Sequence, residues 1–176
     1  MKSISHSGQI SIWLLSTIIM VILMILIGGV TRLTDSGLSM VEWRPLWGFL
    51  PPISQFEWNR VFELYMKSPE YIFKNKGMSL EEFKEIFFWE YFHRLWGRLI
   101  GIIFIIPLLF FIIVKKIPKS ILSKLFLILF LGGLQGFIGW WMVKSGLVND
   151  PTVSQYRLTI HLSNALLILS LLIWVY

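Results

Sequence analysis

Two histidines sit where their imidazoles could reach the same iron atom. His93 lies near the start of one long apolar segment, and His161 lies near the start of another. An ionisable side chain at membrane depth is costly and indicates a functional site by default. Two imidazoles at matching depth on neighbouring helices can hold a haem iron between them. The spacing alone leaves open whether such a haem carries electrons or is a substrate.

The helix that carries His93 presents further groups that suit haem. At 100° per residue, an arc of about 140° on this helix holds a carboxylate, an imidazole, two guanidiniums and two glycines. These residues are Glu90, His93, Arg94, Arg98, Gly97 and Gly101. We predict that Arg94 and Arg98, with Arg157 one turn before His161, bind haem propionates. Anchoring at lipid head groups, or pairing with Glu90 at helical spacing, would also explain arginines on this arc.

The glycines of these segments have two explanations. Gly97 and Gly101 leave room for a flat cofactor, but this spacing is also typical of close helix packing. A second run holds Gly132, Gly133, Gly136 and Gly139 around Gln135, the one polar residue deep in its apolar segment. Helix crowding explains this stripe better than a cofactor does.

Composition indicates an integral membrane protein. The chain has 176 residues, 56% of them hydrophobic, and a mean hydropathy of +0.71. This is too apolar for an ordinary soluble domain. Cysteine is absent, which excludes disulfides, iron–sulfur clusters and thiolate ligands. The net charge of +6 comes without a nucleic-acid-binding motif, so we expect no nucleic-acid partner and read the lysines as topology signals.

Four hydrophobic runs predict four membrane spans, at about residues 10–30, 95–114, 125–143 and 158–176. The first run is too long for a signal-peptide core and is expected to remain as an anchor. The expected fold is therefore an all-α integral membrane protein, a four-transmembrane-helix bundle. Because the sequence stops inside the fourth run, we expect it to be a fragment of a longer protein.

Lysine placement predicts the orientation of the chain. Lys2 precedes the first span, and four lysines crowd the link between the second and third spans, at positions 115, 116, 119 and 124. The positive-inside rule places both segments in the cytoplasm. Both histidines then face the outer side. The lack of an Arg-rich leader favours the cytoplasmic membrane of a bacterium over an organelle.

The outer segment, residues 31–89, is expected to be helical. Ser54 and Ser79 each precede a glutamate by three residues, which is the pattern of a capping box. The first outer helix is expected to stop before Pro69, and the second to continue unbroken into the second span. The aromatic residues of this segment suit an interfacial belt. They are Trp43, Trp47, Trp58, Tyr65, Phe87 and Trp89.

Several motifs together resemble haem A synthase, of the type shared by alphaproteobacteria and mitochondria. They are residues 28–40 (GGVTRLTDSGLSM), 51–52 (PP), 68–71 (SPEY), 82–84 (EFK), 90–94 (EYFHR), 139–147 (GWWMVKSGL) and 156–158 (YRL) with His161. The resemblance covers nearly the whole chain, in order. The missing cysteines agree with this type, which lacks the outer-loop cysteine pair of some relatives.

The resemblance implies an eight-span protein in two similar halves, of which residues 1–176 are the N-terminal half. The implied reaction oxidises a methyl group of haem O to a formyl group, giving haem A for cytochrome oxidase. His93 and His161 would then face the substrate iron, and Glu90 matches the catalytic glutamate of the family. A haem b cofactor belongs to the absent C-terminal half, so we expect the fragment alone to be inactive.

The resemblance and the composition also suggest partners. These are haem O, the lipid bilayer, haem O synthase and a second copy of the chain. Two other functions remain open at this stage. One is a bis-His membrane cytochrome b that carries electrons, with no role for Glu90. The other is a non-catalytic assembly partner that uses the outer aromatic segment.

Overall fold

The computed structural model describes residues 8–42, 48–147 and 151–176. Within these ranges the chain forms six helices and no strand. They are α1 (Gly8–Leu33), α2 (Gln55–Tyr65), α3 (Pro69–Phe73), α4 (Leu80–Ile113), α5 (Lys119–Gly146) and α6 (Gln155–Val175). The expectations for Lys2, Trp43 and Trp47 concern residues outside the described ranges.

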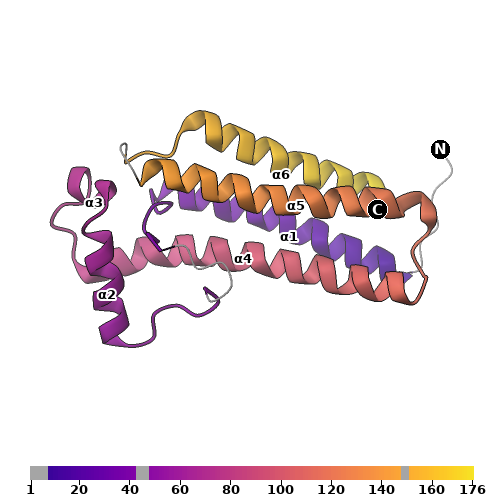
Figure 1. Cartoon of the computed structure of the whole chain (residues 1–176), viewed down its shortest axis with the longest axis horizontal. Coiled ribbons are helices and arrows are strands. Elements are labelled where there is room, and N and C mark those ends of the chain that lie inside the picture. The colour runs from indigo at the N-terminus through magenta and orange to yellow at the C-terminus, as the bar shows by residue number, and fades with distance from the viewer. Residues whose placement is uncertain (1–7, 43–47, 148–150) are drawn as a thin grey trace.

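Four of these helices are long and apolar enough to cross a membrane, which confirms the expected all-α class. Helices α1, α4, α5 and α6 run side by side in alternating directions (Figure 1). Each extends beyond the apolar run from which its span was predicted. The largest extension is in α4, which has 34 residues and begins at Leu80, fifteen positions before the expected span. The amphipathic stretch before His93 contains no helix breaker, so the helix continues through it as expected.

The apolar core lies at the end of the bundle away from α2 and α3. Helix α1 packs against α4 and α6, and α5 packs against α6. Each of the four long helices contributes almost fully buried side chains there, including Leu14, Leu108, Leu125 and Leu172. At the opposite end, polar side chains enter the bundle.

A proline in α4 is compensated by a tryptophan from α1. Pro107 has no backbone N–H, so the carbonyl of Ile103, four residues earlier, loses its helical partner. The indole Nε1 of Trp13 donates a hydrogen bond to this carbonyl at 2.9 Å. In the reverse direction, Trp96 of α4 donates to the carbonyl of Met20 in α1 at 3.0 Å. These two bonds join α1 and α4 at two levels of the bundle.

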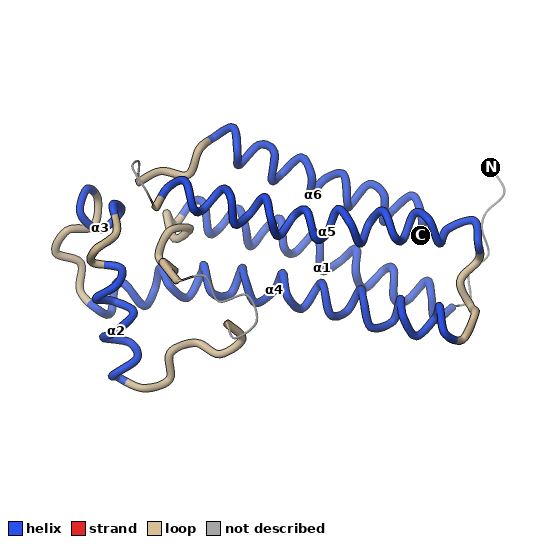
Figure 2. The backbone as a smooth tube through the Cα atoms, in the orientation of Figure 1, coloured by secondary structure: helices blue, strands red, loops and turns tan. Residues whose placement is uncertain are grey.

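Helices α2 and α3 sit at one end of the bundle, and α2 packs against α4 (Figure 2). Tyr65, Phe83 and Phe87 form a second small core there. Trp58 joins it through an edge-to-face contact with Phe87, at 5.1 Å between ring centroids. The interfacial belt is therefore wrong for Tyr65 and Phe87, because their rings are buried against other aromatic rings.

The helix caps agree only partly with the sequence. The capping box at Ser79 is confirmed, with both reciprocal bonds to Glu82 formed. At Ser54 only half of it forms, because the Glu57 carboxylate pairs with Arg60 at 3.4 Å instead of reaching back. Helix α3 was not expected from the sequence; Ser68 caps it and Pro69 occupies its first turn.

Candidate functional site

The two histidines belong to different helix pairs but lie toward the same end of the bundle. His93 is in α4 and His161 is in α6, both toward the end that carries α2 and α3 (Figure 1). Helices α4 and α6 both pack against α1, so the two residues predicted to bind iron lie toward one end of the same bundle.

Each histidine lies against a glycine of the helix that pairs with its own. A Cβ atom added to Gly28 of α1 would lie 3.3 Å from Nε2 of His93. A Cβ added to Gly139 of α5 would lie 3.1 Å from Cε1 of His161. Both distances are tighter than ordinary side-chain contacts, so glycine at these positions leaves the space that each ring occupies.

Polar side chains from α5 and α6 surround His161. The amide Nε2 of Gln135 lies 3.3 Å from Nε2 of His161 and donates to the His161 carbonyl at 3.1 Å. Asn164 in turn donates to Oε1 of Gln135 at 2.7 Å and to the carbonyl of Leu131 at 3.1 Å. Within the described ranges, Nδ1 of His161 is buried and makes no hydrogen bond.

The residues around the two histidines fit an iron porphyrin. Imidazole nitrogens are common haem ligands, and here they come from two helices that both pack against α1. The glycine opposite each imidazole carries no side chain that would clash with the ring. Separately, Nδ1 of His161 is buried without a hydrogen-bond partner in the described ranges, so a group beyond those residues is needed to satisfy this atom.

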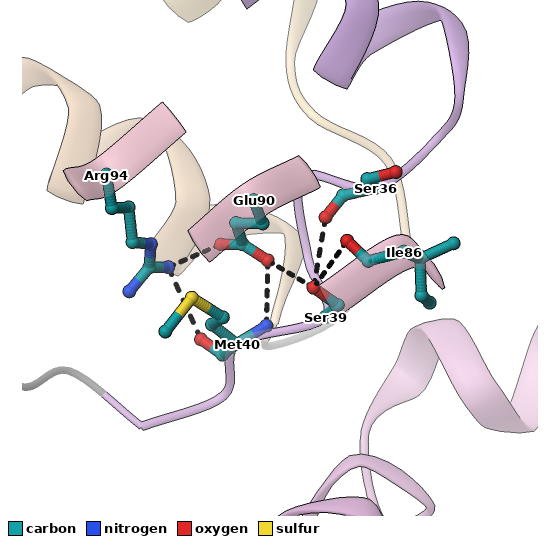
Figure 3. Close-up of polar contacts among 6 residues, drawn as sticks. All are labelled: Ser36, Ser39, Met40, Ile86, Glu90 and Arg94. Carbon is teal, nitrogen blue, oxygen red and sulfur yellow. Dashed lines mark hydrogen bonds and ion pairs between the residues drawn. The ribbon is translucent and has the colours of Figure 1, made fainter. Parts of the chain in front are cut away.

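Glu90 is buried, and both of its carboxylate oxygens are engaged. Its side chain is 3% exposed. The hydroxyl of Ser39 and the backbone N–H of Met40 each donate to Oε2 at 2.7 Å, and Arg94 donates to Oε1 (Figure 3). Three donors suit an ionised carboxylate, which accepts hydrogen bonds at both oxygens. Glu90 thereby joins the loop after α1 to the first third of α4.

The three arginines predicted to bind propionates contact protein groups. Arg94 pairs with Glu90, which is one of the alternatives noted from the spacing, and also donates to the carbonyl of Met40 at 3.3 Å. The Arg98 guanidinium lies 5.5 Å from the centre of the Phe49 ring. Arg157 stacks on Trp141 at 4.3 Å and donates to its carbonyl at 2.9 Å. The predicted contacts of these arginines with propionates stay predictions.

The remaining glycines divide between two environments. A Cβ on Gly97 would lie 3.3 Å from the terminal methyl of Met24 in α1, which supports helix packing at this position. At Gly101, Gly133 and Gly136, a Cβ would meet no described side chain within 4 Å. Close packing therefore does not explain the whole glycine stripe of α5.

A groove of about 300 Å³ lies beside the loop after α1, whose residues Ser39 and Met40 contact Glu90. Ser39 and Met40 form one side of it, and Glu57 and Phe87 are among the other lining residues. Neither histidine lines this groove, so the histidine pair and the groove are separate features.

Sequence reasoning missed Gly28, Ser39 and the contact between Gln135 and His161. Gln135 had a signal, since it is the one polar residue deep in its apolar segment. Gly28 and Ser39 had none beyond their place in a motif. Their partners lie far along the chain, and only the packing of α1 against α4 identifies them.

Known proteins similar to this chain share one description. The family model for cytochrome oxidase assembly proteins (COX15-CtaA) matches residues 11–176. A haem A synthase from Nitrosospira multiformis is 56% identical over 166 residues, which is 94% of this chain and 47% of that protein. Haem A synthases from Nitrosomonas eutropha and Parvibaculum lavamentivorans are 53% and 46% identical over 99% and 98% of the chain. The chain spans about half the length of these relatives. No solved structure matches it.

Proposed function

Because this chain belongs to the COX15-CtaA family of cytochrome oxidase assembly proteins, we propose that it is the substrate-binding half of a haem A synthase. The proposed reaction oxidises a methyl group of haem O to a formyl group, giving haem A for cytochrome oxidase. The observation that carries the proposal is the placement of His93 and His161 toward one end of the bundle, each beside a glycine, in a chain whose relatives are haem A synthases.

His93 and His161 are the proposed ligands of the substrate iron. When bound, haem O would supply the methyl carbon that is oxidised. The role of the two imidazoles is then to fix the porphyrin between the α1/α4 and α5/α6 helix pairs. Arg94, Arg98 and Arg157 are proposed to neutralise its propionates, since their side chains are the cations nearest to the histidines in the sequence.

Glu90 is proposed to act as a fixed negative charge beside the reacting carbon. Oxidation withdraws electrons from that carbon, so positive charge develops there, and a preorganised carboxylate would stabilise it. The three hydrogen-bond donors on Glu90 support this role, because they engage both carboxylate oxygens and hold the group in one position.

The rest of the proposed enzyme is inferred from the resemblance to the family. A second four-helix half would hold a haem b cofactor, and haem O synthase is a proposed supplier of substrate. A second copy of the chain is a further proposed partner. The proposed location is the cytoplasmic membrane of a bacterium, with the N-terminus in the cytoplasm and the histidines toward the outer face. The lysines at positions 115, 116, 119 and 124, which lie between α4 and α5 or in the first turns of α5, support this orientation.

The proposal is tested by the product of the full-length protein, co-expressed with a source of haem O. Haems are extracted and separated by chromatography for the wild type, for Glu90→Gln and for the control Glu85→Gln. Glu85 is on the same helix but exposed. We expect haem A from the wild type and the control, and retained haem O from Glu90→Gln.

Three outcomes would contradict parts of the proposal. Unchanged haem A from Glu90→Gln would remove this residue from the chemistry. A wild type that makes no haem A but holds one six-coordinate haem b would favour the electron-carrying cytochrome. A protein with no haem-dependent spectrum would favour a non-catalytic assembly partner.

A further inference from the structure

The two histidines differ in how their rings are held. Nε2 of His161 has the Gln135 amide at 3.3 Å, whereas no hydrogen bond joins the ring of His93 to another residue within the described ranges. Nε2 is one of the two imidazole nitrogens that can bind a metal. A group already placed on that nitrogen competes with iron for it.

The donor and acceptor in this contact follow from the surrounding bonds. Asn164 donates to Oε1 of Gln135, and the amide nitrogen of Gln135 donates to the carbonyl of His161. The Gln135 group that faces the ring is therefore its NH₂, which can only donate. Nε2 of His161 must accept with its lone pair, and the neutral ring then carries its proton on Nδ1. That lone pair is the one an iron atom would use.

We propose that Gln135 is a positioning residue that caps the iron-binding lone pair of His161. His93 then binds the substrate iron directly, and His161 binds it only in exchange for the Gln135 hydrogen bond. This inference rests on the proposed function, because it requires a haem at the histidine pair. A substrate haem must enter and leave as product, and one firm ligand with one exchangeable ligand meets this requirement.

Two further contacts support the proposed role of Gln135 beside His161. Asn164 orients the Gln135 amide through its bond to Oε1, so the cap does not depend on a freely rotating side chain. Gly139, one turn after Gln135 on α5, lies against Cε1 of the same ring. Helix α5 therefore determines both what contacts Nε2 and how closely the ring approaches the helix.

The experiment compares purified full-length wild type with Gln135→Leu. Leucine has a similar size but cannot donate a hydrogen bond. Each protein is titrated with ferric haem O, and in parallel with iron protoporphyrin IX. The spectrum before addition is subtracted. Absorption and electron paramagnetic resonance report the ratio of six-coordinate low-spin to five-coordinate high-spin haem, and transfer to apomyoglobin reports the rate of haem loss.

Removing one competing hydrogen bond should change the exchange equilibrium by roughly threefold to tenfold. We expect the ratio of six-coordinate to five-coordinate haem in Gln135→Leu to rise by that factor and haem loss to slow accordingly. Gln135→Met should behave in the same direction, which guards against a folding defect in one variant. Gln155→Leu, an exposed position at the start of α6, is the matched control and should leave both readouts unchanged.

The opposite sign would overturn the inference. If both Gln135 variants lower the six-coordinate fraction or speed haem loss, Gln135 merely orients His161. An unchanged ratio of six-coordinate to five-coordinate haem would also overturn the proposal that Gln135 caps His161. If the wild type binds neither haem, the proposed function fails and this inference fails with it. If the wild type binds haem and both Gln135 variants show the same coordination ratio and the same rate of haem loss, only the inference about Gln135 fails.

Discussion

The backbone nitrogen of Met40 lies 2.7 Å from Oε2 of Glu90, a residue fifty positions later in the chain. Ser39 donates to the same oxygen from the preceding position. The loop after α1 and the first third of α4 are therefore joined through one buried carboxylate. A substitution at Glu90 changes both a charge beside the histidine and the anchor of this loop, so the two effects need separate tests.

Ser39→Ala tests the anchor while leaving the carboxylate in place. Removing a donor from a buried charged acceptor should lower the free energy of unfolding by about 1–3 kcal/mol. Denaturant unfolding in detergent measures this change. Ser170→Ala is the control, because its exposed hydroxyl bonds only to a carbonyl of its own helix. A Ser39→Ala protein as stable as that control would show that the anchor contributes little.

Gly28→Ala tests the space beside His93. The new Cβ would lie 3.3 Å from Nε2 of the ring, so the imidazole must shift by a few tenths of an ångström or turn. Overpacking of this kind costs about 1–3 kcal/mol, which should weaken haem binding by roughly fivefold to a hundredfold. Haem titration followed by absorption measures the effect.

The neighbouring glycine provides the control for that measurement. A Cβ on Gly29 would meet nothing within 4 Å in the described ranges, so Gly29→Ala should bind haem like the wild type. Equal affinities of Gly28→Ala and Gly29→Ala would contradict a role for this glycine in placing His93.

The sequence predicted features that depend on local patterns. Apolar runs of about 20 residues predicted the four long helices, because a membrane-crossing helix must satisfy its backbone internally. The capping box at Ser79 was also predictable, since its two partners are three residues apart. Helix α3 was missed because its five residues, Pro69–Phe73, are too few to show a periodic pattern.

Contacts between distant residues could not be predicted in the same way. The helical arc of α4 grouped Glu90, His93 and Gly97 on one face, but the structure gives each of them a different neighbour. Glu90 contacts the loop after α1, while Gly97 faces Met24 within α1. An arc fixes which residues point in one direction, whereas the partner depends on how the helices rotate and pack.

Glu70 makes the stability of the outer segment depend on pH. Burial raises the pKa of Glu70 to about 7 from a usual 4.5, although the hydrogen bond from Tyr65 at 3.0 Å opposes the rise. A carboxyl with a higher pKa in the folded chain binds more protons there than in the unfolded chain. The free energy of unfolding should therefore fall as pH rises from 4.5 to about 7.

Denaturant unfolding at pH 5 and pH 8, followed by tryptophan fluorescence, measures this dependence. The glutamine in Glu70→Gln does not ionise. This variant should therefore lose the part of the pH dependence of the free energy of unfolding that comes from residue 70. The exposed Glu63→Gln on α2 should retain it. The same slope in Glu70→Gln and in the wild type would show that Glu70 titrates alike in both states.

The bond from Trp13 to Ile103 predicts a coupling between two substitutions. Trp13→Phe leaves the Ile103 carbonyl without a partner in an apolar bundle, because Pro107 cannot supply an N–H. The orphaned carbonyl should lower the free energy of unfolding by about 1–3 kcal/mol, in addition to the loss of ring volume. In a Pro107→Ala background the new N–H can bond to that carbonyl. Trp13→Phe should then lower the free energy of unfolding by less.

A double-mutant cycle separates the contribution of the hydrogen bond between Trp13 and the Ile103 carbonyl from the loss of ring packing. We expect a coupling energy of about 1 kcal/mol or more between Trp13→Phe and Pro107→Ala. Trp96→Phe is the matched comparison, because its acceptor, the carbonyl of Met20, lies in a helix stretch without proline. Its cost should be the same with either residue at position 107. Zero coupling for Trp13 would mean that another group satisfies the Ile103 carbonyl once the indole is gone.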